Sequence, residues 1–181
     1  MKKMILSVLI LFTITGIIGC SGNTDFSTRE QTEQERNDAI NATSGMQVTI
    51  TNLLPTINQG KPDLNIYFCC SLADGNHKEI DRCAQTDQKE RCVRLNGVLH
   101  NGEKNFYHIS AKDLKRISDL GNGQTEFMFA DPYQVTPVPS PCWESDNFVL
   151  SHDFEIKQVW DIKVTKRNAL SYGCEINRID N

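Results

Sequence analysis

The sequence lacks the motifs by which many enzymes and ion-binding proteins are recognised. It contains no G-x-S-x-G nucleophile elbow and no glycine-rich loop that would cradle a phosphate. Its cysteines do not form the C-x₂-C knuckles of zinc sites, and the acidic residues between positions 74 and 90 lack the spacing of a calcium-binding loop. We therefore expect no catalytic residues, no metal and no cofactor, and we predict that the protein is not an enzyme and has no small-molecule substrate.

Basic residues are outnumbered by acidic ones, and long apolar runs are scarce. The chain has 19 Lys and Arg residues against 23 Asp and Glu, a formal net charge of −4. An acidic balance argues against nucleic acid or anionic lipid head groups as partners, because both bind basic surfaces. The longest uncharged, mostly apolar run covers about 15 residues from Met4 to Ile18, fewer than the roughly 20 that a membrane-spanning helix needs.

That short run has the layout of a secretory signal. Lys2 and Lys3 precede it, and Ile17-Ile18-Gly19-Cys20 ends it. These last four residues resemble the lipobox of bacterial lipoproteins, in which the Cys sulfur takes a diacylglycerol and the peptide is cut just before it. The resemblance implies that residues 1–19 are a signal peptide and that Cys20 is the lipid-attachment residue, with a palmitate-type anchor that holds the protein to the membrane. An ordinary cleaved signal is the alternative.

The segment after Cys20 is predicted to be a flexible tether. Residues 20–45 are rich in polar side chains and have too few apolar groups to offset the entropy of ordering; the alternative is a short or frayed helix over residues 32–41. The resemblance to lipoproteins, with Ser21 after the lipidated Cys, implies the periplasmic face of the outer membrane. Met46 stands at the start of the predicted domain, residues 46–181, and translation from it would give an unanchored cytosolic form, which nothing in the sequence supports.

Six cysteines remain once Cys20 is assigned to lipid. An even number in an exported chain predicts three disulfides. Strand alternation places Cys70 and Cys174 on core faces and Cys69 on an outer face, which favours the pairs Cys70–Cys174, Cys83–Cys92 and Cys69–Cys142.

Alternating apolar and polar residues predict a mainly β domain. Strands are expected over residues 46–51, 64–70, 125–129, 154–165 and 172–177, with a shorter one near Val93 and a surface loop over residues 77–91. Ser110 is placed to cap a single short helix that Gly121 ends. We predict one disulfide-braced β-sandwich or open barrel with one short helix.

The candidate functional residues point to binding. Ser151, His152 and Asp153 are adjacent, and neighbouring residues on an extended chain point to opposite sides, so they cannot form a catalytic triad. His100 and His108 are interpreted as solvated residues, although a hairpin would bring them together. The proline-rich loop of residues 131–143 carries two aromatic residues, Tyr133 and Trp143, which we predict to contact a protein partner unless Trp143 folds into the core. The loop from Asp74 to Glu90 is expected to steer a basic partner.

The signal, polar tether and cysteine-rich β domain together resemble the periplasmic immunity lipoproteins of type VI secretion, in particular those that inhibit phospholipase effectors. The resemblance implies that the protein binds a cognate lipase toxin and blocks its active site. The alternatives are a structural or assembly lipoprotein of an envelope complex, an envelope hydrolase, and an inhibitor of a host or envelope hydrolase.

Overall fold

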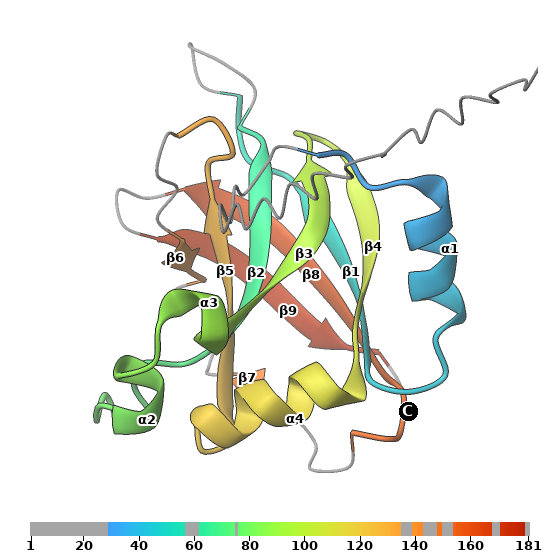
Figure 1. Ribbon diagram of the computed structural model, residues 1–181. Helices are drawn as coiled ribbons and strands as arrows, with labels where there is room; N and C mark the ends of the chain where they lie inside the picture. Colours follow the sequence, from blue (N-terminus) through green and yellow to red (C-terminus); the bar gives the residue numbers. More distant parts are fainter. Residues whose placement is uncertain are drawn as a thin grey trace, which may run out of the picture.

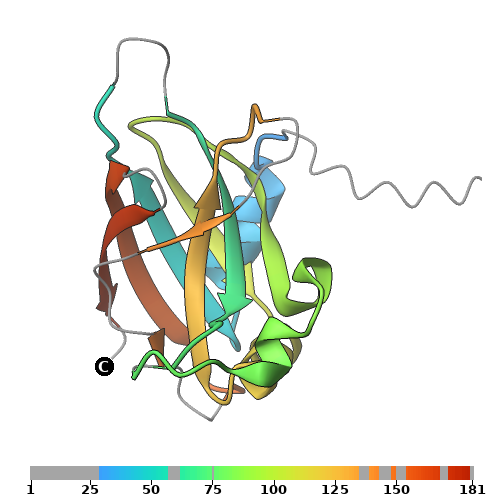
Figure 2. The same ribbon diagram turned by 90° about the vertical axis from the view of Figure 1, so that its left-hand side faces the viewer.

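The computed structural model describes residues 29–56, 62–74, 76–134, 139–142, 148–149, 154–167 and 171–179. They form two β-sheets packed face to face, as the views in Figures 1 and 2 show. The strands of the first sheet, in spatial order, are β4 (Lys104–Ile109), β1 (Met46–Asn52), β8 (Gln158–Arg167) and β9 (Tyr172–Arg178). Those of the second are β3 (Cys92–Leu99), β2 (Leu64–Cys70), β5 (Gln124–Ala130) and β6 (Ser140–Pro141), and β7 (Phe148–Val149) also pairs with β5. The predicted mainly β, two-layer fold is confirmed.

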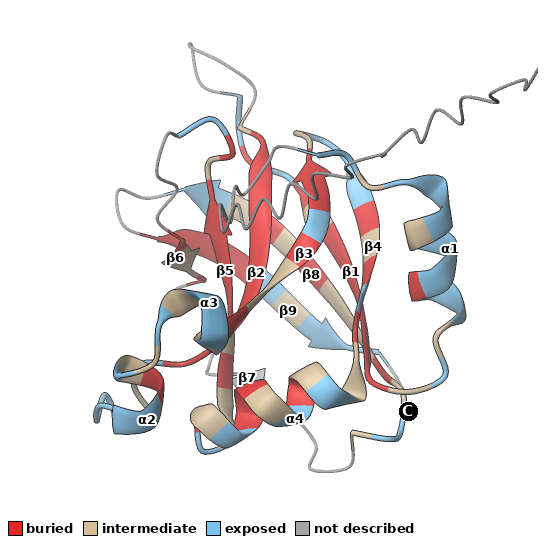
Figure 3. Ribbon diagram, viewed as in Figure 1, coloured by how far each residue is buried: buried red, intermediate tan, exposed pale blue. Residues whose placement is uncertain are grey.

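The core lies between the two sheets and follows the alternation in the sequence. In β1, Met46, Val48 and Ile50 are fully buried and face inwards. Phe68 and Phe127 meet them from the other sheet, with their ring centroids 5.1 Å apart. Figure 3 shows that the buried residues concentrate along the strands. Each side chain of this size contributes roughly 1.5–3 kcal/mol when removed from water, so this layer supplies much of the stability.

The six cysteines form three disulfides, but the predicted pairing is wrong. The bonds join Cys69 to Cys92, Cys70 to Cys83, and Cys142 to Cys174. The predicted faces hold, because Cys70 lies in the main core and Cys69 on the outer side of the second sheet. Alternation shows on which face of the sheet a residue lies, but not which residue of the adjacent strand lies beside it. In the register of β2 and β3, Cys69 lies directly opposite Cys92.

The helices are more numerous than the single one predicted. The expected helix is present as α4 (Ala111–Leu120), with Ser110 accepting from the Asp113 amide at its start and Gly121 at its end. The predicted surface loop over residues 77–91 contains two short helices, α2 (Asp81–Ala84) and α3 (Gln88–Arg91). None of the helices in the described residues is both long and apolar enough to cross a membrane.

Part of the predicted flexible tether is a docked helix, α1 (Glu33–Asn41). A reciprocal capping box starts it, because Thr32 accepts from the Glu35 amide and Glu35 accepts from the Thr32 amide. Arg36 Nη2 donates to Asn105 Oδ1 of β4 across 2.6 Å. The alternative, a short helix over residues 32–41, is therefore the one the structure has for this part of the segment. The expectation of a flexible tether failed here because α1 buries only Ala39 and is held by polar contacts that hydrophobic patterning does not reveal.

Candidate functional site

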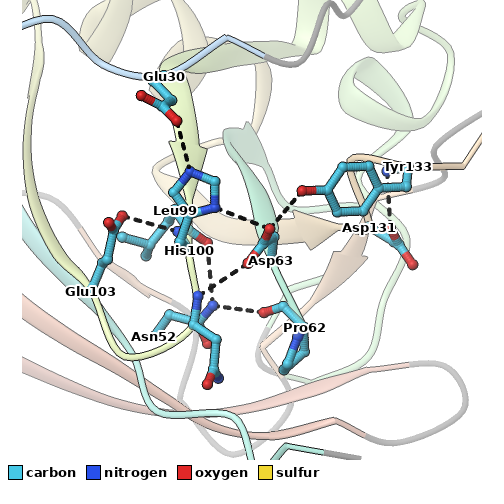
Figure 4. Close-up of polar contacts among 10 residues, drawn as sticks. Glu30, Asn52, Pro62, Asp63, Leu99, His100, Glu103, Asp131 and Tyr133 are labelled. Atoms are coloured by element: carbon cyan, nitrogen blue, oxygen red, sulfur yellow. Dashed lines mark hydrogen bonds and ion pairs between the residues drawn. The ribbon is translucent and has the colours of Figure 1, made fainter. Parts of the chain in front are cut away.

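A concentrated group of polar contacts lies around Asp63, where the second sheet ends. This residue directly precedes β2, which pairs antiparallel with both β3 and β5. The final residues of those two strands therefore flank the start of β2, with Leu99 opposite Leu64 and Ala130 opposite Asn65. The topology thus brings together three segments that are far apart in sequence (Figure 4).

The carboxylate of Asp63 accepts three hydrogen bonds. Oδ2 accepts from the Tyr133 hydroxyl at 2.6 Å and from His100 Nδ1 at 3.0 Å. Oδ1 accepts from the backbone amide of Asn101 at 3.1 Å. Because a carboxylate only accepts, Nδ1 of His100 must carry a proton. Asp63 is only 7% exposed, so these three bonds replace the water that burial removed.

The ionisation of Asp63 and His100 is shifted toward their charged forms, whereas Tyr133 is held as a neutral phenol. Burial raises the pKa of Asp63, but the bonds from Tyr133, His100 and the Asn101 amide outweigh burial, and the net pKa is below its ordinary value. The bond to Asp63 raises the pKa of His100 above its ordinary value. Nε2 of His100 lies 3.4 Å from the Glu30 carboxylate, so both ring nitrogens face acceptors and the imidazolium is favoured. The same carboxylate raises the pKa of Tyr133, because its hydroxyl donates to Asp63.

Two asparagines fix the surrounding loops. Asn52, at the end of β1, donates from Nδ2 to the carbonyl oxygens of Pro62 at 2.7 Å and Leu99 at 3.2 Å. Asn101 donates from Nδ2 to the Leu54 carbonyl at 2.7 Å. We call this end of the sandwich, defined by Asn52, Asp63, His100 and Tyr133, the loop end. The opposite end, with α2, α3 and α4, is the helical end.

Tyr133 is an exposed aromatic side chain held in one place. It is 66% exposed, yet its hydroxyl is bound to the buried Asp63, and its amide donates to Asp131 Oδ1 at 2.9 Å. Arg167 of β8 approaches Asp131 within 3.8 Å, which ties the turn to the other sheet. A ring fixed in this way loses little conformational entropy when a partner covers it.

The predicted site residues have different outcomes. Tyr133 is exposed at the loop end, whereas Trp143, Cys20 and the Ser151-His152-Asp153 run lie outside the described residues. His100 and His108 are not brought together, because His108 Nε2 contacts the Ser44 carbonyl at 2.8 Å. Reasoning from sequence missed Asp63 entirely. Its only signal was an acidic residue directly before a strong apolar strand.

The predicted acidic loop, residues 74–90, borders a groove, and most of its charged side chains are exposed. At the helical end, a groove of about 570 Å³ opens between α4 and the segment that carries α2 and α3. Its charged lining residues are Arg82, Lys89, Arg116, Glu90 and Asp119. Bases outnumber acids there, so this groove gives no support to the prediction that the loop steers a basic partner.

Comparison with known proteins gives no family assignment. No protein-family model matches the chain, and no significant match was found among curated proteins or solved structures.

Proposed function

We propose that this protein is a membrane-anchored periplasmic binding protein, an immunity lipoprotein that neutralises a type VI secreted antibacterial phospholipase by binding it and covering its active site. The lipobox resemblance at Cys20 and the three disulfides support an exported, anchored protein.

The observation that carries the proposal is the fixed, exposed ring of Tyr133. Interface hot spots are enriched in tyrosine, and the most effective ones are rigid before the partner arrives. Leu53, which follows β1 at the loop end, is also exposed, so a partner at this end could contact a second apolar side chain besides Tyr133. A protein surface that blocks an enzyme needs such anchors and needs no catalytic group of its own.

The test is capture and inhibition with the mature protein. Proteins secreted by the type VI apparatus of a sibling strain are passed over the immobilised protein, and retained proteins are identified by mass spectrometry. We expect one phospholipase to be retained and inhibited, and Tyr133→Ala to weaken its binding by about tenfold or more. The matched control is Leu72→Ala, which removes an exposed apolar side chain just after β2 at the helical end and should leave binding unchanged. Recovery of a multi-protein envelope assembly, with no phospholipase, would favour the assembly lipoprotein instead.

One observation favours a second candidate, an envelope hydrolase. A buried Asp63 that holds Nδ1 of His100 is the arrangement by which hydrolases orient a general base, a role that His100 would take only above its raised pKa, after Nε2 has lost its proton. Nε2 points to Glu30 rather than to a described hydroxyl or thiol nucleophile, so the nucleophile would have to be water or the substrate itself. Ester hydrolysis by the pure protein that is lost in His100→Ala and kept in His108→Ala would favour this candidate.

A further inference from the structure

The chain joins the sandwich at the loop end. The Glu30 carboxylate lies 3.4 Å from His100 Nε2, and Gln31 Nε2 donates to the Phe106 carbonyl at 2.6 Å. From there α1 runs along β4 towards the helical end, as Figure 1 shows. Everything that precedes Arg29 in sequence is therefore connected to the domain beside Asp63 and Tyr133.

This junction is tightly packed. Gly97 of β3 has a φ of +92°, and a Cβ added there would lie 2.5 Å from the backbone nitrogen of Gln31. Asn96, the preceding residue, donates to Glu35 Oε1 at 3.1 Å. Backbone contact on β3 and side-chain contacts on both edge strands hold the start of α1 in place.

The distance from the junction to the anchor is short. Nine peptide links join Cys20 to Arg29, and at 3.3–3.6 Å per residue they reach at most roughly 30 Å. The two ends of the sandwich are separated by strands of seven to ten residues, a length of roughly 23–33 Å. If the strands stand upright on the membrane, the helical end can face the lipid only if the connecting chain spans nearly the whole length of the sandwich.

We propose that the loop end, with Tyr133, faces the membrane that holds Cys20, so that its partner is a protein working at the lipid surface. This inference rests on the lipid anchor of the proposed function. In this orientation the binding surface lies at the membrane surface, where a phospholipase acts. The anchor confines the protein to that surface, so it diffuses in two dimensions to reach the enzyme.

The experiment uses the full lipidated protein, labelled with ¹⁵N, in phosphatidylcholine nanodiscs that contain a gadolinium-chelate lipid. Relaxation of backbone amides then reports their distance from the membrane. We expect amides of Leu53, Gly102 and Tyr133 to relax several-fold faster than those of Thr86 and Lys115 at the helical end. Equal relaxation at the two ends, or faster relaxation at the helical end, would overturn the proposal.

Two controls separate this inference from the proposed function. Inserting a 20-residue Gly/Ser segment between Thr28 and Arg29 should reduce the difference between the two ends; an unchanged difference would mean that the domain itself binds lipid, and would overturn the proposal. Radiolabelled palmitate should enter the protein and be absent from Cys20→Ser. If the wild type takes up no palmitate, Cys20 is not lipidated, and both the anchored function and this inference are wrong. If it takes up palmitate but the two ends relax equally, only the proposed orientation is wrong.

Discussion

The Tyr133 hydroxyl donates to Oδ2 of Asp63 across 2.6 Å, so an exposed ring is attached to one of the most buried carboxylates in the described chain. Asp63 directly precedes β2, an inner strand of its sheet, and Tyr133 follows the neighbouring strand β5. The hydrogen bond therefore restricts the motion of an exposed side chain by attaching it to a residue fixed at the end of the sheet.

Replacing Asp63 by Asn should destabilise the loop end. The substitution places an NH₂ group where two donors, from His100 and Tyr133, now meet an acceptor. Leaving buried polar groups unmatched costs about 1–3 kcal/mol, so the free energy of unfolding in urea should fall by that amount. Asp119→Asn, which removes an exposed pair with Lys115 on α4, should change it by less than about 1 kcal/mol. Equal losses in the two variants would contradict this account of Asp63.

Stability from the Asp63–His100 contact should depend on pH in a defined window. The raised pKa of His100 gives stability that is present below its ordinary value of 6.5 and lost as the pH rises through the raised pKa. The lowered pKa of Asp63 gives stability that is present above its ordinary value of 3.8 and lost as the pH falls through the lowered pKa. The contact is therefore strongest between these two values.

The measurement is urea unfolding of the wild type and of His100→Gln, which keeps a donor and removes the titration. The difference in unfolding free energy should be larger at about pH 5 than at about pH 8. If the difference between the wild type and His100→Gln instead grew as the pH rose, His100 would not be stabilised as an imidazolium by Asp63 and Glu30.

The Cys142–Cys174 bond should be the disulfide that contributes most to stability. It joins Cys142, directly after β6 of one sheet, to β9 of the other, and it closes the longest interval, 32 residues, against 13 for Cys70–Cys83. Replacing both Cys142 and Cys174 by Ala should lower the free energy of unfolding by about 2–4 kcal/mol, and more than the same change at Cys70 and Cys83. A peptide map of the unreduced protein checks the pairing first; Cys83 joined to Cys92 would refute the observed connectivity.

Gly97 and Gly102 form a matched pair for testing how α1 is held. Both have a positive φ, +92° and +81°, so Ala is strained at either position. Only at Gly97 would the new Cβ collide with Gln31, because nothing lies within 4 Å of the position at Gly102. Gly97→Ala should therefore speed amide hydrogen exchange in residues 33–41, while Gly102→Ala should leave it unchanged. Equal exchange rates in the two variants would show that the docking of α1 does not depend on the close approach of Gln31 to Gly97.

Much of the fold could be predicted because strands and helices leave local patterns. Alternation identified β1, β2 and β9, and it identified β8 except for its start, which was predicted at residue 154 and lies at Gln158. The Ser110 cap with Gly121 identified α4. The same alternation gave the faces of Cys69 and Cys70. The disulfide partners could not be predicted from it, because they depend on which strands are neighbours and in what register.

The candidate site could be predicted only in part. Tyr133 was recognised as an aromatic residue in a rigid loop, but its bond to Asp63 joins residues 70 apart in sequence and exists only because β3 and β5 flank β2. His100 was taken for a solvated residue for the same reason. Neither contact has a local signature, since each forms where loops from three strands converge.

We propose that the protein, held to the membrane through Cys20, protects its own cell by presenting Tyr133 to a toxin. The most direct measurement is survival in competition with a sibling that delivers type VI effectors. We predict that cells lacking the protein are killed, that wild type and Leu72→Ala restore survival, and that Tyr133→Ala restores it poorly although it reaches the membrane in equal amount. Equal survival with and without the protein would contradict the account.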